Sequence, residues 1–439
     1  MKLRLFSCIY LALVFVLSGI QPVLAEVASA LPIIHLNINK TKPGIVGTQL
    51  GHEVRRQFPD VEVRYDRYLA ERFSQQAFNR ITSTRLPTML KQLDNHYRDE
   101  LYGVANAWSL GGDNKLGDGR LSLAEYQVLN LLSDLGAAPN GSGFAVMGKA
   151  SENGSPIVGR NLDWAMQTEL RQLQAITVYQ DNDKGIVSIG FAGLISVITG
   201  FNEQGLFVAG MNAEAFTPYT SNKEMSSDFS LLSFDLRKAL ETRSSIKKAA
   251  RYLAGKHYAY NHNILLADQE SVQVLEQNAT RDKSLLRTWQ SGLQYGSNRW
   301  DHRYQIAVVD CFLLPKNGNC TDPKDVTRWK TFNSLATFSA RNPANTQEIT
   351  KIMHNTDNHQ YEIFNRDTLQ SIIFQPEQSG LRLYTIPPDG QHPRHPVYTD
   401  YPELLPQVNG FNIQLLINAL IWGILLTLLG VTVWQIRKH

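Results

Sequence analysis

The sequence contains little cysteine, little charge and no low-complexity segment. Its 439 residues include 3 Cys, and charged residues make up 19% of the chain. The 43 Lys and Arg residues nearly balance the 40 Asp and Glu residues, which leaves a net charge of +3. So small an excess does not favour nucleic-acid binding. A hydrophobic fraction of 43% is typical of a globular protein and excludes a disordered or coiled-coil chain.

Residues 1–25 have the pattern of a secretory signal peptide. Lys2 and Arg4 give a basic start, and the stretch from Leu5 to Leu17 is almost wholly apolar. Ala25 then provides a small residue for cleavage. An uncleaved anchor helix is the alternative interpretation of this segment.

The C-terminal end predicts a membrane-spanning helix. No charged residue occurs between Ile413 and Trp434, and a helix of that length reaches about 33 Å, enough to cross a bilayer core. The basic residues Arg437 and Lys438 follow at once, and positive charge stays on the cytoplasmic side. We therefore expect a single-pass membrane protein with a cytoplasmic tail at 435–439 and its body in the periplasm or outside the cell. A buried core helix is the alternative.

The cysteines agree with an exported body. Cys8 leaves with the signal peptide, so Cys311 and Cys320 remain, on either side of the turn-rich segment 314–318. In an oxidising compartment such a pair is expected to form a disulfide that closes one loop.

The pattern of the chain changes near residue 140. Apolar periodicity through 65–135 predicts a helical N-terminal segment at 26–140. Short β-rich runs separated by turns then alternate with helices, which predicts an α+β domain at 141–386. The Pro-rich segment 387–412 is expected to form a stalk that leads to the membrane.

One predicted β-hairpin carries the polar residues of greatest interest. Its first strand begins at Ser142, its turn contains Asn153 and Gly154, and its second strand includes Arg160 and Asp163. A buried arginine and aspartate require pairing or a polar site. Taken alone, a structural ion pair explains them as well as catalysis does.

The hairpin resembles the N-terminal-nucleophile hydrolases of the choloylglycine hydrolase, acid ceramidase and isopenicillin-N acyltransferase group. Gly159–Trp164 reads Gly-Arg-Asn-Leu-Asp-Trp and is similar to one family element, and Asn202–Leu206, followed by Asn212, is similar to another. Ser297–Arg303 lies where the family has an Asn and, further on, an Arg. The similarity covers roughly residues 95 to 385. It implies a four-layer αββα fold and a small-molecule amide substrate, with neither cofactor nor metal.

This sequence departs from the family at the nucleophile. The position that usually holds Cys falls on Gly141, and Ser142 follows. In one interpretation Ser142 is the nucleophile, freed by self-cleavage of the 141–142 bond. In the other, the nucleophile is lost and the domain is an inactive ligand-binding ectodomain. Asn140, Gly141 and Ser142 also form a glycosylation sequon if the source is eukaryotic.

The resemblance implies a mechanism of linear amide hydrolysis through an acyl-enzyme. The freed α-amino group of the nucleophile acts as the base, since its usual pKa is about 7.7–8.0. Arg160 and Asp163 would orient it, and Asn212 and Asn298 would donate hydrogen bonds to the oxyanion. Arg303 would lie near the substrate or near Asn298. An N-acyl amine or acylated amino acid is the expected substrate, and acyl transfer uses the same residues. The expected catalytic set is Ser142, Arg160, Asp163, Asn212, Asn298 and Arg303.

A segment at 113–125 has a partial likeness to a calcium-binding loop. Asn114, Asp118 and Glu125 fall on ligand positions, but Leu116 occupies another. A helix that begins at Ser122, with Glu125 completing a capping box, explains the same residues and is the favoured interpretation.

Overall fold

The structure is a computed structural model that describes residues 30–136, 139–165, 168–213, 229–279, 283–295, 298–318, 320–356, 362–393 and 396–406. The predicted signal peptide and membrane span lie outside these ranges. Within them, no helix combines the length and the apolar character needed to cross a membrane.

The larger of two main sheets has eight strands in the order β1-β4-β5-β6-β7-β8-β9-β10. Only the β1–β4 pair of this sheet is parallel. The strands are β1 (Ile33–Asn37), β4 (Gln174–Asp181), β5 (Lys184–Phe191), β6 (Thr199–Asn202), β7 (Phe207–Asn212), β8 (His262–Ala267), β9 (Val272–Asn278) and β10 (Lys283–Arg287).

The second main sheet is antiparallel, with the order β13-β2-β3-β14-β15-β16. Its strands are β13 (Gln305–Val308), β2 (Asn140–Val146), β3 (Ile157–Asp163), β14 (Thr368–Gln375), β15 (Gly380–Thr385) and β16 (Thr399–Tyr401). A separate hairpin pairs β11 (Leu293–Tyr295) with β12 (Asn298–Trp300).

The two main sheets pack face to face, because alternate side chains of each strand point to opposite faces. Along β2, Ala145 enters the core between the sheets, whereas Phe144 and Val146 face the helices outside. Across the interface, Phe374 of β14 packs against Phe201 of β6, with the two rings tilted and their centroids 4.6 Å apart. The inter-sheet core is therefore continuous and apolar.

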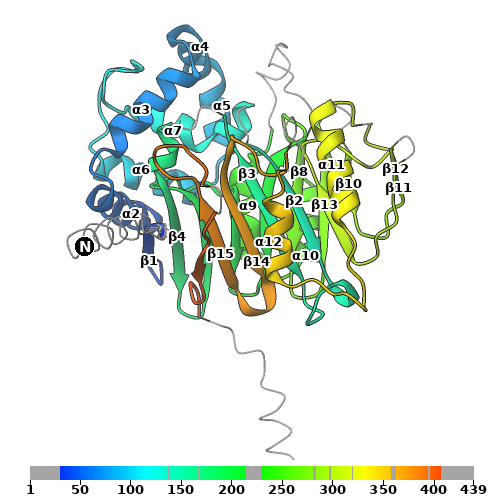
Figure 1. Cartoon of the computed structure of the whole chain (residues 1–439). Helices are drawn as coiled ribbons and strands as arrows, with labels where there is room; N and C mark the ends of the chain where they lie inside the picture. The colour runs from blue at the N-terminus through cyan, green and yellow to red at the C-terminus, as the bar shows by residue number, and fades with distance from the viewer. Residues whose placement is uncertain are drawn as a thin grey trace, which may run out of the picture.

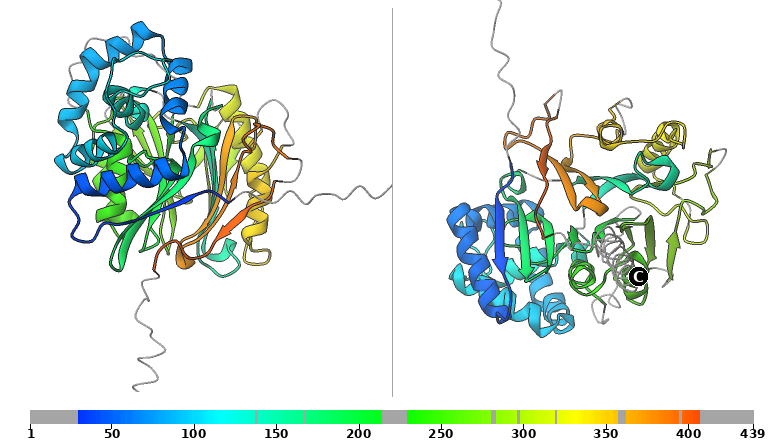
Figure 2. Two further views of the ribbon diagram at one scale, coloured as in Figure 1. Left: turned by 90° about the vertical axis from the view of Figure 1, so that its left-hand side faces the viewer. Right: turned by 90° about the horizontal axis from the view of Figure 1, so that it is seen from below.

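Helices cover both outer faces of this sandwich (Figures 1 and 2). α11 (Pro323–Leu335) and α12 (Thr346–Met353) pack on the six-stranded sheet. The other face carries α9 (Leu232–Thr242), α10 (Ile246–Ala254) and an N-terminal group: α2 (Pro43–Gln57), α3 (Val61–Arg72), α4 (Gln75–Arg80), the π-helix η1 (Ile81–Arg85), α5 (Leu86–Gln92), α6 (Asn95–Ala107) and α7 (Leu123–Asn130). Short 3₁₀ turns are η2 (Leu132–Leu135), η3 (Gly148–Ala150), η4 (Leu170–Gln172) and η5 (Pro376–Gln378). The predicted α+β class is confirmed.

Two predicted segments contribute strands that the sequence did not indicate. The N-terminal segment 26–140 is not wholly helical, because it supplies β1 as an edge strand. The segment 387–412 is not simply a stalk, since β16 pairs with β15 and the following Leu404 and Leu405 are buried between the sheets. Edge strands tolerate neighbouring prolines, which explains why a Pro-rich stretch can join the sheet.

The helix start at residue 122 is confirmed. The Ser122 side chain accepts the amide of Glu125, and the Glu125 carboxylate accepts the amide of Ser122. The preceding loop is held by Asp66 of α3, whose carboxylate accepts the Gly117 and Gly119 amides at 2.6 and 2.7 Å. A capping box and an aspartate anchor thus account for this segment.

A candidate active site at the start of β2

Four of the six residues predicted from the sequence, Ser142, Arg160, Asp163 and Asn212, lie at the end of the sandwich where β2 begins and β3 ends. Asn140 lies opposite Asp163 in this strand pair. β7 of the other sheet ends at the same place, because the Asn212 amide donates to the Pro139 carbonyl at 3.0 Å. The Asn212 side chain also donates to the Asn140 side chain at 3.1 Å. Both sheets therefore contribute to the site.

The two faces of the β2–β3 hairpin separate the predicted residues. Ser142 lies opposite Asn161, whose amide donates to the Met353 and Ile363 carbonyls on the helical side. Asp163 shares that face by the two-residue repeat of a strand. Arg160 points the other way, between the sheets, and donates to the Gly210 carbonyl at 3.1 Å. In the intact chain, Ser142 and Arg160 are thus on opposite faces.

Ser142 is fully buried, and its hydroxyl has no hydrogen-bond partner among the described residues. A buried polar group without a partner costs free energy, and such groups are uncommon in folded proteins. A purely structural role in the core therefore does not explain why a serine occupies position 142.

Gly141 is paired with β3 on one side, and on the other side, where β13 has ended, side chains hold its backbone. β13 ends at Val308, opposite Gly143, and two residues further the same register places Asp310 opposite Gly141. The Asp310 carboxylate accepts the Gly141 amide at 2.8 Å. Arg328, from the second turn of α11, donates to the Gly141 carbonyl at 3.4 Å. A guanidinium thus contacts the carbonyl of the peptide bond that precedes Ser142.

A buried ion pair fixes Arg328. Its Nη2 donates to Asp163 at 2.6 Å, and Asp163 also accepts hydrogen bonds from Asn365 at 3.0 Å and Thr368 at 2.8 Å. Burial alone would raise the pKa of Asp163, but Arg328 and these two donors hold it below its usual range. Asp163 is therefore ionised, and its charge keeps Arg328 in place.

Arg160 offers unused donors between the sheets. Its Nε and Nη1 groups are buried and have no partner among the described residues. A Cβ on Gly141 would lie 3.4 Å from Nη1, so these donors adjoin the Gly141 backbone. Burial lowers the pKa of Arg160 to about 10, opposed by Asp163 and Asp310. Arg160 thus stays cationic at neutral pH and can bind a carbonyl oxygen or an anion.

Two further acids complete the cluster around Arg328. Burial, and next the charge of Asp325, raise the pKa of Asp310 well above its usual range. Burial also raises the pKa of Asp325 to about 6, although the charge of Arg328 and, more weakly, a hydrogen bond from the Asp310 backbone lower it. Three carboxyl groups close to one another cannot all ionise easily, so this cluster holds a proton at moderate pH.

The structure does not bring Arg303 to the site. Arg303 is exposed and precedes β13, and the next residue, Tyr304, accepts the amide of Met147 at the far end of β2. Ser142 and Met147 are about 17 Å apart along an extended strand. Because β13 is antiparallel to β2, the residues after β13 reach the site and those before it do not. Arg303 therefore lies away from the start of β2, and its predicted place near the substrate or near Asn298 stays a prediction.

The predicted role of Asn298 stays a prediction. Asn298 begins β12, in a hairpin separate from both main sheets. Its side chain lies outside the described part of the structure.

The sequence reasoning missed Arg328, Asp310, Asn365 and Thr368. A signal existed for Arg328: Asp325, Arg328, Trp329 and Phe332 have the spacing of one helix face, and all four are buried. A charged residue on an apolar helix stripe requires a buried partner. Asn365 and Thr368 carried no comparable signal.

Gly141 is closed to larger side chains. A Cβ at this position would lie 2.2 Å from the Asn161 carbonyl oxygen, so the backbone would have to move. The position at which the family usually has Cys therefore cannot accept a side chain in this backbone.

Comparison with known proteins gives one family and several distant structures. The sequence model of the family described as acyl-coenzyme A:6-aminopenicillanic acid acyl-transferase matches residues 150–388. That range includes Arg160, Asp163 and Arg328 and begins after Ser142. No curated protein matches the sequence.

The similar solved structures include three amide hydrolases. The Caenorhabditis elegans N-acylethanolamine-hydrolyzing acid amidase ortholog is 18% identical, with a TM-score of 0.39 over 54% of this chain and 92% of that one. A mutant conjugated bile acid hydrolase from Clostridium perfringens is 14% identical, with a TM-score of 0.38 over 61% and 94%. Penicillin V acylase from Agrobacterium tumefaciens is 11% identical, with a TM-score of 0.36 over 60% and 86%.

Proposed function

The chain belongs to the acyl-coenzyme A:6-aminopenicillanic acid acyl-transferase family, and we propose that it is a membrane-anchored hydrolase of linear amides with Ser142 as its nucleophile. Family membership confirms the resemblance to N-terminal-nucleophile hydrolases. The substrate proposed is an N-acyl amine or an acylated amino acid, with acyl transfer to another amine as the related reaction.

One observation carries the proposal: the Gly141 carbonyl contacts Arg328, and the next residue carries a buried hydroxyl that has no partner in the part of the chain that the structure describes. The Ser142 oxygen attacks the Gly141 carbonyl carbon, and Arg328 stabilises the oxyanion that forms. The C–N bond then breaks, leaving an ester at the Ser142 oxygen, and the hydroxyl proton ends on the α-amino group. Water hydrolyses the ester, which yields a Gly141 carboxylate and a free N-terminal Ser142.

Cleavage also resolves the opposite orientations of Ser142 and Arg160. Once Ser142 is a chain end, the alternation of β2 no longer fixes its side chain, and the hydroxyl can turn toward Arg160. Its own α-amino group then accepts the hydroxyl proton as Ser142 attacks the amide. Arg160 and Asn212 are the donors available for the carbonyl oxygen of the substrate, with Asn298 proposed as a further one. The substrate C–N bond then breaks, the proton held by the α-amino group passes to the departing amine, and an acyl ester remains on Ser142. Water hydrolyses this ester, which releases the carboxylic acid and restores Ser142.

A second candidate is a non-catalytic ligand-binding ectodomain. It is favoured by the opposite faces of Ser142 and Arg160 in the intact chain and by the closed Gly141 position. In that case the unused donors of Arg160 would bind a ligand without turning it over.

N-terminal sequencing and intact mass of the purified mature protein test the first candidate. We expect a new N-terminus at Ser142 and two fragments on a denaturing gel. Ser142→Ala should give one uncleaved chain without amidase activity on N-acyl amines and N-acyl amino acids. Ser371→Ala is a matched control, because Ser371 lies in register on the same face of the same sheet and bonds to Tyr398.

The possible outcomes separate the two candidates. An intact wild-type chain whose activity survives Ser142→Ala would exclude Ser142 as the nucleophile. An intact chain without activity would support the ligand-binding ectodomain.

We also propose that the body lies outside the cytoplasm and is held by the span at 413–434. A disulfide in the body is typical of an oxidising compartment. Protease added to intact cells or spheroplasts should digest the body, and deletion of residues 409–439 should release it from membranes. Protection from protease, or membrane association after the deletion, would refute this topology.

A further inference from the structure

We propose that the Cys311–Cys320 disulfide, acting through Asp310, positions the Gly141–Ser142 peptide, so that the site assembles fully only in the oxidised chain. The consequence for cleavage rests on the proposed function of Ser142. The positioning itself does not, because it concerns how Gly141 is held in the intact chain.

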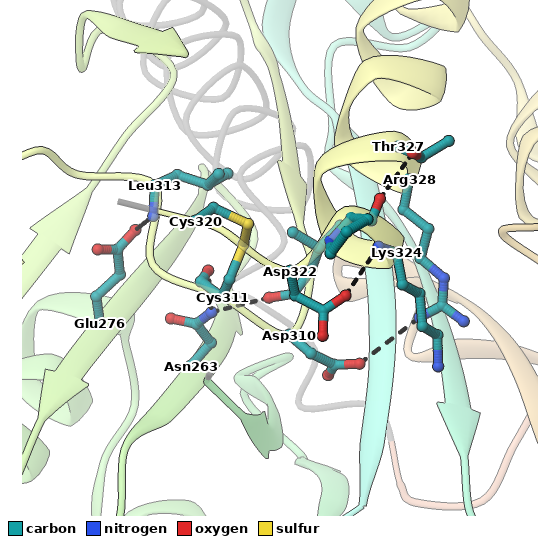
Figure 3. The surroundings of a disulfide bond; sticks show 12 residues. Asn263, Glu276, Asp310, Cys311, Leu313, Cys320, Asp322, Lys324, Thr327 and Arg328 are labelled. Atoms are coloured by element: carbon teal, nitrogen blue, oxygen red, sulfur yellow. Dashed lines mark hydrogen bonds and ion pairs between the residues drawn. A yellow bond between two sulfur atoms is a disulfide. The ribbon is translucent and has the colours of Figure 1, made fainter. Parts of the chain in front are cut away.

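The disulfide joins the two segments that hold Gly141 (Figure 3). Cys311 directly follows Asp310, which accepts the Gly141 amide. Cys320 lies two residues before Asp322, and the Asp322 side chain caps α11 by accepting the Lys324 amide at 2.8 Å. The same helix carries Arg328. One covalent bond therefore links the acceptor of the Gly141 amide to the helix that supplies the donor to its carbonyl.

Hydrogen bonds fix the backbone on both sides of Asp310. The buried Asn263 of β8 donates to the Val309 and Cys311 carbonyls, both at 2.9 Å. The Asp325 carboxyl of α11 accepts the Asp310 amide. Asp310 is thus held by β8 of the eight-stranded sheet, by α11 and by the disulfide, although it follows the end of its own strand.

The middle of the disulfide loop has a separate anchor. The buried Glu276 of β9 accepts the amides of Leu313 and Leu314 and is paired with Arg287 at 3.0 Å. This anchor holds the loop to the eight-stranded sheet, but it does not reach Cys320 or the start of α11. The disulfide is therefore the covalent tie between Asp310 and the segment that enters α11, in addition to the contacts that Asp325 and Arg328 of α11 make with Asp310.

Loss of the disulfide should act first on Gly141. Asp310 takes the place that a continued β13 would have, so the Gly141 amide depends on one side chain for its acceptor. A small shift of Asp310 against α11 breaks this bond or the longer contact between Arg328 and the carbonyl. Gly143 and Ala145 keep their bonds to β13 and Phe144 keeps its bond to β3, so these amides should not respond.

Hydrogen exchange measured by mass spectrometry with residue-level fragmentation tests this proposal on the full mature chain. A Ser142→Ala background keeps the chain intact whether or not the wild type cleaves. In that background, Cys311→Ala/Cys320→Ala and Asp310→Ala should each speed exchange of the Gly141 amide at least ten-fold and leave the Phe144 amide unchanged. Asp310→Asn retains an acceptor oxygen and should restore protection.

General destabilisation is controlled by Leu253→Ala, which opens a cavity under α10 in the opposite helical layer. This variant should leave the difference in exchange rate between the Gly141 and Phe144 amides unchanged.

If the double cysteine variant does not fold, reduction of the folded Ser142→Ala protein gives the same comparison. In the protein that retains Ser142, loss of the disulfide should slow cleavage of the 141–142 bond at least ten-fold, measured at temperatures well below that of unfolding.

The two claims fail in different ways. Unchanged Gly141 exchange without the disulfide, or equal acceleration along all of β2, would overturn the positioning role. A wild-type chain that never cleaves, yet shows the selective change at Gly141, would overturn the proposed function and support the positioning role.

Discussion

The two ends of β2 are stabilised in different ways. At its C-terminal end, Val146 pairs with Gln305 in a regular ladder and packs in an apolar core. At its N-terminal end the neighbouring strand stops, and Asp310 and Arg328 bind the backbone of Gly141 instead. A buried ion pair seldom stabilises a fold better than apolar packing does. The buried charges at the N-terminal end of β2 are therefore better explained by a role in the proposed reaction than by a contribution to the stability of the fold.

The largest expected effect comes from removing the cation at the charged end. Arg328→Met leaves Asp163 and Asp310 buried without their main partner, which should cost about 3–5 kcal/mol of unfolding free energy. Urea denaturation measures this loss. The matched control, Arg382→Met, breaks a partly exposed pair with Asp400 and should cost about 1 kcal/mol or less. Equal losses in the two variants would contradict a special role for the buried pair.

The pH dependence of stability should also come from the charged end. The pKa of Asp325 is raised to about 6, so the folded state keeps a proton that the unfolded state releases near pH 4. The contribution of this group is thus fully present below about pH 4 and is lost as pH rises through about 6. The slope is at most about 1.4 kcal/mol per pH unit for one proton.

Asp325→Asn should remove the loss of stability that accompanies the rise from about pH 4 to about pH 6. Relative to the wild type, the variant should gain stability between about pH 4 and pH 6 and then reach a plateau, as measured by urea denaturation at each pH. A difference that does not vary over this range would show that Asp325 is ionised normally. Asp400→Asn, at an exposed position, is the control.

At the apolar end of β2, the expected loss of unfolding free energy is smaller, and cleavage of the 141–142 bond should not change. Val146→Ala removes two buried methyl groups, which should cost about 2 kcal/mol including the cavity. Cleavage at 141–142 and the exchange of the Gly141 amide should stay as in the wild type, because the contacts of Asp310 and Arg328 are untouched. Slower cleavage in a still-folded Val146→Ala protein would show that the two ends are coupled.

The features that could be predicted from the sequence are those that depend on the pattern of residues within a short segment. The α+β class, the hairpin that carries Arg160 and Asp163, the disulfide and the capping box at Ser122 all follow from spacing or residue type within short segments. Arg328 and Asp310 were missed because their role depends on where β13 stops, which is a property of the sheet register. The separation of Arg303 from the start of β2 was not predictable for the same reason, since local sequence does not give the direction in which β13 crosses β2.

The smallest expected effect on stability is at Ser142 itself. Removing a hydroxyl normally costs about 1 kcal/mol when its hydrogen bond is lost. The Ser142 hydroxyl is buried and has no partner among the described residues, so Ser142→Ala should be neutral or raise the unfolding free energy by up to about 1 kcal/mol. Ser371→Ala, on the same face, loses a 2.7 Å hydrogen bond to Tyr398 and should destabilise the protein by about 1 kcal/mol.

Thermal unfolding should be compared in uncleaved chains, with Ser371→Ala placed in the Ser142→Ala background. A residue kept for chemistry should give this pattern, in which its loss abolishes cleavage and leaves the fold unharmed, whereas a marked loss of stability in Ser142→Ala would assign the hydroxyl a structural role.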